Sequence, residues 1–225
     1  IMGRSMARLD VPSKTDGTAQ FGIDAIAPGM KYAAIRRSPV FGGTVAKVDR
    51  GGAGDLAGVI DVIDLGDAVA VVGDGYWQAS RALSQIDIEW NDGGNGAVSQ
   101  ESIFAQFARD LDRADATGED VNDDVVTGDA GAALASADRI VDAEYRVPYL
   151  AHAPMEPLNC TAWIHDGTCE IWTGSQNPLG VRAEVAEAIE FDPENVEVHN
   201  GFLGGGFGRR AFGDFAAQAA RIAQA

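Results

Sequence analysis

The first part of the chain alternates short apolar runs with turns. Gly, Pro and Asp separate four strand-like runs, at residues 32–35, 44–48, 59–63 and 68–72. A helical pattern covers residues 75–83, and residues 86–90 alternate apolar and polar side chains as a half-buried strand does. This succession predicts a compact α/β unit over residues 1–95.

A helix and an acidic stretch come next. Ser99 is a good helix cap, Glu101 suits the positive end of the helix dipole, and apolar side chains recur at helical spacing at Ile103, Phe104, Phe107, Ala108 and Leu111. Residues 112–129 are acidic and nearly devoid of core residues, which favours a solvated linker over an acidic binding site. We therefore assign residues 96–138 to a connecting helix and an acidic linker.

A second α/β unit is expected over residues 139–225. Residues 141–147 alternate like a strand, and Asp166-Gly167 is a typical hairpin turn between strand-like runs at residues 160–164 and 169–172. Val181, Val185 and Ile189 have helical spacing, and a strand at residues 196–199 leads into a glycine-rich loop at residues 201–208.

The segment from Asp214 onward is a good helix pattern. It contains no glycine, proline or basic last turn that would end a helix. We therefore expect the chain to be an internal piece of a longer protein.

Composition and charge exclude several classes of function. With 225 residues, of which 46% are hydrophobic, the chain can bury one sizeable core or two modest ones. A net charge of -17 opposes binding to nucleic acid or to anionic lipid, and no run approaches the roughly 20 apolar residues of a membrane span. No export signal stands at Ile1, so the compartment stays open between the bacterial cytoplasm and the periplasm. We expect no disulfide between Cys160 and Cys169.

The glycine-rich loop is the first candidate site. Consecutive glycines cost backbone entropy, so they are best tolerated where a ligand approaches the main chain or where positive φ is needed. A following helix with Arg209 and Arg210 would direct N–H groups and positive charge at an anion. From the residues alone, a purely structural turn explains the loop equally well. The loop lacks the spacing of ATP-binding and NAD-binding motifs.

Other polar residues give weaker signals. His152 and Glu156 have the spacing of helical metal ligands, but Pro154 and Pro157 exclude a regular helix, so a hydrogen-bonding or structural role is favoured. The 3 histidines are scattered, so no metal site is predicted. Gln176 precedes a helix start, and taken alone it fits a helix cap better than a ligand. No serine lies in a nucleophile elbow, so hydrolase chemistry lacks support.

Six sequence motifs together resemble a known family. The runs AHAPMEPLNCTA from Ala151, CEIWTGSQNP from Cys169 and LGGGFGRR from Leu203 are similar, in order and spacing, to the molybdopterin-binding large subunit of the xanthine dehydrogenase/aldehyde oxidase superfamily. Upstream, RLDVPSKTDGTAQFGID from Arg8, AIRRSPVFGGTVAKVD from Ala34 and VAVVGDGYWQA from Val69 resemble the α/β hammerhead domain of that subunit. The resemblance covers nearly the whole chain.

The resemblance implies roles for single residues. A glutamine at the position of Gln176 hydrogen-bonds an oxo ligand of molybdenum in the family, and the backbone around Phe207 and Gly208 lies against the metal and the pterin dithiolene. Gln176 and Phe207 are thus the candidate catalytic residues, and the candidate cofactor-binding residues are Gly205, Gly206, Phe207, Gly208 and Arg209. The Arg209-Arg210 pair and the run from Met155 to Pro157 favour the isoquinoline 1-oxidoreductase beta-subunit branch and argue against xanthine as substrate.

The fold and function implied are those of a molybdenum hydroxylase. We expect a hammerhead domain, a connecting segment, and the first part of a molybdopterin-binding domain. The parent would hydroxylate an N-heterocycle or an aldehyde with water as oxygen source, using molybdopterin cytosine dinucleotide and a small [2Fe-2S] subunit. The family's glutamate base lies outside these residues, so this chain alone is expected to be inactive and to hold no molybdenum. The alternative is a non-catalytic interaction module in which the glycine loop is only a turn.

Overall fold

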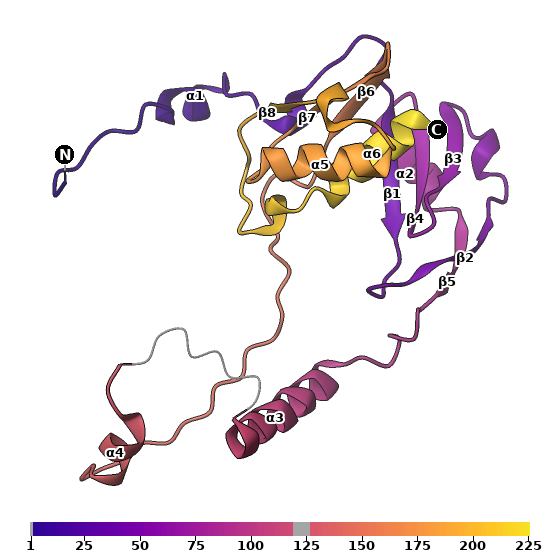
Figure 1. Ribbon diagram of the computed structural model, residues 1–225. Coiled ribbons are helices and arrows are strands. Elements are labelled where there is room, and N and C mark those ends of the chain that lie inside the picture. The colour runs from indigo at the N-terminus through magenta and orange to yellow at the C-terminus, as the bar shows by residue number, and fades with distance from the viewer. Residues whose placement is uncertain (1, 119–126) are drawn as a thin grey trace. The chain divides into compact units, whose positions relative to one another are not determined.

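A computed structural model describes residues 2–118 and 127–225. Its contacts divide the chain into two compact units. The larger unit combines Ile1–Gly94 with His152–Ala225, and the smaller one is Asn95–Ala151. Figure 1 shows the elements of both units.

The first sheet of the larger unit contains β1 (Tyr32–Arg37), β3 (Val59–Asp64) and β4 (Ala68–Gly73) in the antiparallel order β1-β4-β3. The central strand β4 is an almost unbroken apolar run, and its residues 68–71 are fully buried. Helix α2 (Tyr76–Leu83) packs on one face of the sheet, where Val69, Val71 and Ile86 belong to the core. The other face meets Ile222 of the C-terminal helix α6 (Asp214–Gln224). Burial on both faces explains why β4 lacks polar alternation.

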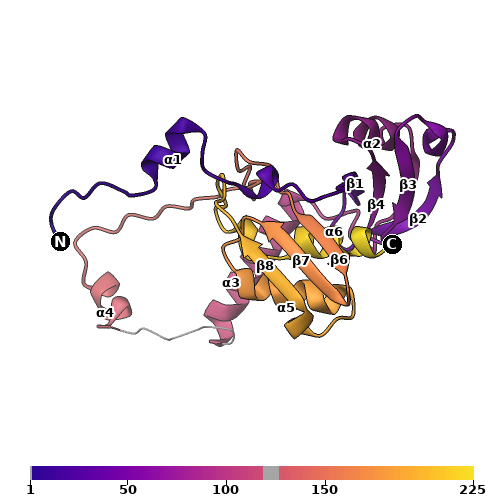
Figure 2. The same ribbon diagram turned by 90° about the horizontal axis from the view of Figure 1, so that it is seen from above.

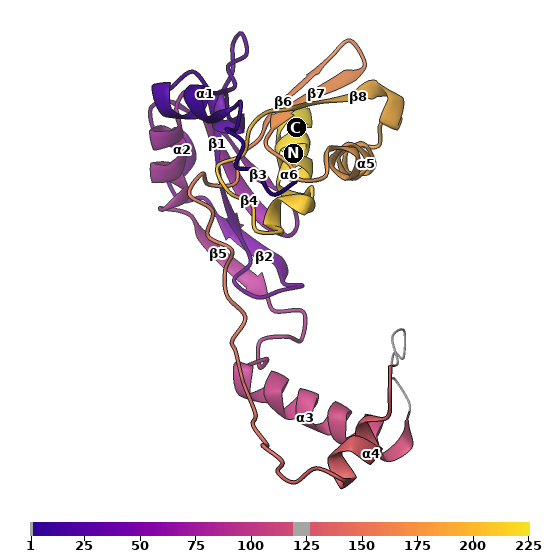
Figure 3. The same ribbon diagram turned by 90° about the vertical axis from the view of Figure 1, so that its left-hand side faces the viewer.

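A separate two-stranded ribbon pairs β2 (Thr44–Asp49) with β5 (Asp87–Asn91), as Figure 3 shows. Every strand predicted in the first part of the chain is therefore confirmed, with small shifts at its ends. The short helix α1 (Val11–Asp16) was not predicted. The described part of the chain also contains four 3-10 helices: η1 (Gly22–Asp24), η2 (Ala53–Asp55), η3 (Pro193–Asn195) and η4 (Arg209–Ala211).

The second sheet of the larger unit has the order β6-β7-β8, with β6 (Thr161–His165), β7 (Thr168–Thr173) and β8 (Val196–Asn200). Strands β6 and β7 form the predicted hairpin, and positive φ at Asp166 and Gly167 gives the expected turn. Helix α5 (Pro178–Ala188) connects β7 to the parallel strand β8. The apolar face of this sheet packs against α5 and α6, which lie on the same side of the sheet (Figure 2).

The two cysteines of this region are free thiols. Cys169 lies opposite Ile164 across the hairpin, so the register does not pair it with Cys160. Burial raises the pKa of the Cys169 thiol to about 11 and raises that of Cys160 further. Both side chains therefore act as small apolar groups of the core.

The smaller unit contains α3 (Gln100–Thr117) and α4 (Ala130–Ala135). The predicted cap is confirmed, because the Ser102 N–H donates to Ser99 Oγ at 3.2 Å. Part of the acidic stretch, residues 112–117, belongs to α3, and residues 119–126 lie outside the described residues.

The predicted strand at residues 141–147 is wrong. Among the described residues no strand pairs with this segment, and its alternating side chains are exposed. An unpaired extended segment has no ladder hydrogen bonds to hold it, so apolar alternation alone does not make a strand.

Candidate functional site

The candidate site lies at one edge of the second sheet. Strands β7 and β8 are parallel, so their carboxyl ends, at Thr173 and Asn200, meet at the same edge. The Gly201 N–H donates to Thr173 O at 2.9 Å, and the Ser175 N–H donates to Asn200 Oδ1 at 2.7 Å. These bonds hold the segment after β7 beside the glycine-rich loop after β8. Carboxyl ends of parallel strands are common ligand sites.

Gln176 contacts the glycine-rich loop directly. The Gly208 N–H donates to Gln176 Oε1 at 3.0 Å, and the Gln176 N–H donates to Arg210 O at 3.0 Å. The structure thus confirms that Gln176 and residues 206–208 share one edge. Because the amide oxygen accepts from the backbone, the amide orientation is fixed and the Nε2 hydrogens point elsewhere. Gln176 is exposed, and no described residue accepts a hydrogen bond from its Nε2.

Two glycines of the loop are constrained, one by a close contact and one by its backbone conformation. A Cβ on Gly206 would lie 2.5 Å from Gln176 Oε1, so a side chain there would displace the amide. Gly205 has φ of 102°, which L side chains rarely adopt. Phe207 adopts φ of 53° although it has a side chain, and that side chain is 74% exposed. Positive φ is a strained backbone state for a non-glycine residue, which makes Phe207 a candidate functional residue.

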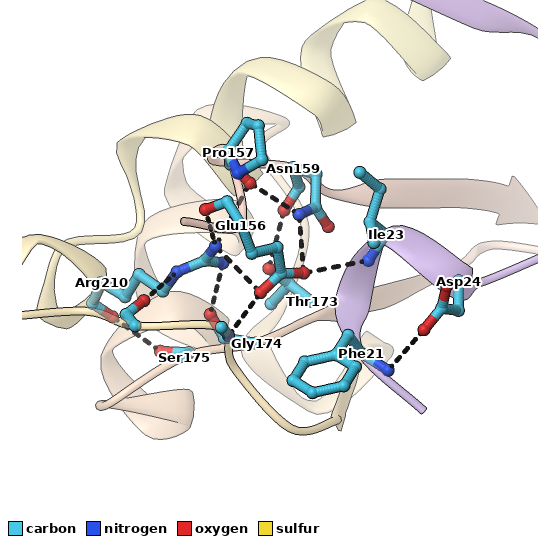
Figure 4. A network of polar contacts seen from close by, with 12 residues as sticks. Phe21, Ile23, Asp24, Glu156, Pro157, Asn159, Thr173, Gly174, Ser175 and Arg210 are labelled. Atoms are coloured by element: carbon cyan, nitrogen blue, oxygen red, sulfur yellow. Dashed lines mark hydrogen bonds and ion pairs between the residues drawn. The ribbon is translucent and has the colours of Figure 1, made fainter. Parts of the chain in front are cut away.

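Arg210 supports the loop from inside the protein. Its side chain is fully buried and forms an ion pair with Glu156 Oε2 at 3.0 Å. Its guanidinium also donates to backbone carbonyls on three segments, those of Gly205, Gly174, Glu156 and Pro157. Figure 4 shows Arg210 at the centre of this network. The buried charge is therefore paired and hydrogen-bonded, as burial requires.

Glu156 extends the same network. Its Oε2 accepts from the Gly204 N–H at 2.7 Å, and its Oε1 accepts from the Ile23 N–H at 3.2 Å and from Asn159 Nδ2 at 2.9 Å. One carboxylate thus joins the N-terminal segment to the glycine-rich loop (Figure 4). This agrees with the structural role predicted for Glu156, while His152 is exposed.

Arg209 has a different partner from the one expected. Its guanidinium binds both oxygens of Asp214, at 2.7 and 2.8 Å, and Arg37 of β1 donates to the same carboxylate at 2.6 Å. Partial burial opposes ionisation of Asp214, but the hydrogen bonds from Arg209 and Arg37 outweigh it and hold the pKa of the carboxyl below its usual value. Both arginines that follow the loop are therefore paired with carboxylates. The predicted cofactor contact of Arg209 stays a prediction.

The residues at this edge fit a pterin cofactor. Gln176 offers an oriented amide donor without a described partner, and the Gly206 backbone lies so close to this amide that a Cβ would displace it. The Phe207 side chain is exposed. Gln176, Phe207 and the backbone of Gly205, Gly206 and Gly208 would hold the group. The sequence predicted that Gln176 and residues 206–208 lie together, and their contact with a cofactor stays a prediction. The Arg210 network was missed, because the sequence alone does not distinguish a buried arginine from an exposed one.

The sheet edge with Gln176 and the glycine-rich loop lies within the larger unit, and comparisons with known proteins indicate its class. Residues 114–225 match the family described as molybdopterin cofactor-binding domain. None of the helices in the described part of the chain is both long and apolar enough to cross a membrane.

Longer proteins match nearly the whole chain. The membrane-bound aldehyde dehydrogenase (pyrroloquinoline-quinone) of Gluconacetobacter polyoxogenes is 33% identical over 96% of this chain and 29% of its own length. The isoquinoline 1-oxidoreductase subunit beta of Brevundimonas diminuta is 30% identical over 100% of this chain and 29% of its own length. The crystal structure of quinoline 2-oxidoreductase from Pseudomonas putida 86 shares the fold, with a TM-score of 0.69 at 19% identity, over 98% of this chain and 33% of that one.

Residues 114–225 therefore belong to the molybdopterin cofactor-binding domain family, and the chain as a whole is similar to molybdenum-binding subunits of aldehyde oxidoreductase and xanthine dehydrogenase. The isoquinoline 1-oxidoreductase beta subunit is among the relatives that it matches at 30% identity, which agrees with the branch expected from the motifs. The chain spans 29% of the length of each of the two curated relatives described above.

Proposed function

We propose that this chain forms part of the cofactor wall in the large subunit of a molybdenum hydroxylase. The observation that carries the proposal is the exposed Gln176 amide, whose oxygen accepts from the Gly208 N–H and whose nitrogen has no acceptor among the described residues. The substrate proposed is an N-heterocycle or an aldehyde, and the added oxygen comes from water. The cofactor proposed is the cytosine dinucleotide form of molybdopterin, and the partner proposed is a small [2Fe-2S] subunit that takes the electrons.

The division of the chain is part of the proposal. Residues 1–95 would form the hammerhead domain, residues 96–138 the connecting helix and linker, and residues 139–225 the first part of the molybdopterin-binding domain. Arg37 and Asp214 support a fixed junction of the first and last of these, because their ion pair joins β1 to α6 at 2.6 Å.

The molybdenum cofactor, when bound, supplies the redox chemistry and the activated water. The residues of this chain would orient the bound cofactor and stabilise developing charge. Gln176 Nε2 would donate a hydrogen bond to an acceptor on the cofactor, with its direction set by the Gly208 contact. A donor held in place before the reaction costs no reorganisation when charge develops, which is how preorganised donors lower a barrier. The Phe207 ring and the loop backbone would exclude water from that side.

The test uses the full-length subunit that contains this chain, purified with its partner subunit. Product formed in ¹⁸O-labelled water should carry the label, whereas label entering only from O₂ would contradict the proposal. Gln176→Ala should lower kcat on the order of 10²-fold or less, with a smaller change in KM and unchanged molybdenum content. Gln85→Ala, which changes an exposed glutamine remote in sequence from the loop, is the matched control. Unchanged turnover in molybdenum-replete Gln176→Ala would remove Gln176 from the mechanism.

A further inference from the structure

The outer face of the second sheet carries an unexpected set of side chains. Alternate residues of a strand point to opposite faces, and the face that packs on α5 and α6 takes the apolar ones, such as Ile171 and Val198. The residues between them point the other way. They are Trp163 and His165 on β6, Glu170 and Trp172 on β7, and Glu197 and His199 on β8.

Glu170 lies between two imidazole rings. Its Oε1 is 2.9 Å from His165 Nε2, and its Oε2 is 2.8 Å from His199 Nε2. Each ring packs on a tryptophan: the His165 and Trp163 centroids are 4.0 Å apart, and the His199 and Trp172 rings stack with centroids 4.8 Å apart. Residues that are 34 positions apart in the sequence, His165 and His199, thus meet at one carboxylate, so the histidines are not all scattered in space.

A second carboxylate lies beside the first. Glu170 and Glu197 are direct neighbours in the parallel register of β7 and β8. Like charges opposite each other on one face of a sheet are destabilising. Within the described part of the chain, no Lys or Arg forms an ion pair with either carboxylate, and their charged contacts are only with histidine. His199 Nδ1 is 3.9 Å from Glu197 Oε1, so this imidazole touches both acidic groups.

We propose that Glu170, Glu197 and His199 bind a zinc ion. One ligand atom from each of the three residues lies within 4.8 Å of the others, so small side-chain rotations bring all three to bonding distance of one ion. Zinc accepts imidazole nitrogen and carboxylate oxygen, and a positive ion relieves the repulsion of the paired carboxylates. Three protein ligands leave one position of a tetrahedral ion for water or an exogenous ligand.

The neighbouring residues support this assignment. His165 Nε2 is hydrogen-bonded to Glu170 Oε1 and is therefore a positioning residue. Metal-binding carboxylates are commonly oriented by such hydrogen-bonded partners. Trp172 fixes the plane of the His199 ring. Solute can reach the site, because the side chains of Glu197 and His199 are 71% and 35% exposed. The zinc site does not involve Gln176 or the glycine-rich loop, so it is independent of the proposed function.

Zinc titration of the 225-residue chain by isothermal calorimetry tests the proposal. Millimolar magnesium and about 0.15 M salt suppress non-specific binding to the acidic surface. One zinc per chain should bind under these conditions. His199→Gln and Glu197→Gln should each weaken binding by about tenfold or more, and His165→Gln by about tenfold. His152→Gln, which changes the exposed histidine outside the cluster, is the matched control and should bind as the parent does.

Several results would overturn the proposal. They are the absence of saturable zinc binding, equal binding by His199→Gln and the parent, and equal losses in His199→Gln and His152→Gln. Glu197 has a side chain that is 71% exposed, so Glu197→Gln gives a decisive result even where His199→Gln does not fold. X-ray absorption of the zinc-loaded chain should show imidazole and oxygen ligands only, whereas a sulfur ligand would place the ion at Cys160 or Cys169 instead.

Discussion

Removal of the Arg210 guanidinium should strongly destabilise the larger unit. The Arg210 side chain is 0% exposed and that of Glu156 is 7% exposed, so Arg210→Met leaves a buried carboxylate without its cation. Breaking a buried ion pair from one side costs about 3–5 kcal/mol. The carbonyls of Gly174 and Gly205 lose their donor as well, but they belong to the same network, so their cost is not added separately. We expect the free energy of unfolding to fall by about 3–5 kcal/mol.

Urea unfolding of the 225-residue chain measures this loss. Tryptophan fluorescence reports on the larger unit, since Trp163 and Trp172 lie on β6 and β7 and the other two tryptophans lie on α2 and β5. Far-ultraviolet circular dichroism reports on the whole chain. Arg209→Met is the matched control, because the Arg209 side chain is 24% exposed and its ion pair with Asp214 should contribute at most about 1 kcal/mol. A loss below about 1 kcal/mol in Arg210→Met, or one equal to that of the control, would refute the assignment of Arg210 as the support of the loop.

Three further outcomes are expected. Gly206→Ala in the full-length subunit should lower kcat about as much as Gln176→Ala, because the new Cβ would lie 2.5 Å from the Gln176 amide oxygen. Gly52→Ala, which has open space around it, is the control and should keep the parent kcat. Equal activity of the two glycine variants would contradict the close approach. The pKa of Asp214 is lowered in the folded chain, so its pairing contributes stability above the unfolded pKa of about 3.9 that is lost as pH falls through the folded value. The free energy of unfolding of Asp214→Asn should therefore fall less than that of the parent chain as the pH is lowered. An acid-unfolding profile identical to that of the parent chain would refute the pairing. Elemental analysis after gel filtration should find no stoichiometric molybdenum on the isolated chain, because Gln176 and Phe207 lie on an exposed edge with few walls; retained metal would show that this edge suffices.

Local patterns predicted most of the secondary structure. The turn at Asp166-Gly167, the cap at Ser99 and the apolar run of β4 depend on residues next to one another in sequence, and all three are confirmed. The meeting of Gln176 with the glycine-rich loop was also predictable, because both follow strands whose carboxyl ends share an edge.

Features that depend on distant segments were not predictable. Arg210 reads as a surface charge in sequence, and its burial follows from carbonyl groups and a carboxylate that only the fold brings around it. The meeting of His165 and His199 at Glu170 depends on strand order and register, which no single stretch of sequence determines. The strand expected at residues 141–147 failed for the same reason, because a strand requires a partner and the alternation does not supply one.

A structure of the full-length subunit with its cofactor bound tests the central claim most directly. The measurement is the distance from Gln176 Nε2 to the nearest atom of the molybdenum cofactor. We expect a hydrogen-bond distance of about 3 Å, with the backbone of residues 206–208 in contact with the same group. A cofactor that lies more than about 15 Å from Gln176, beyond the reach of any hydrogen bond or single ligand, would contradict it.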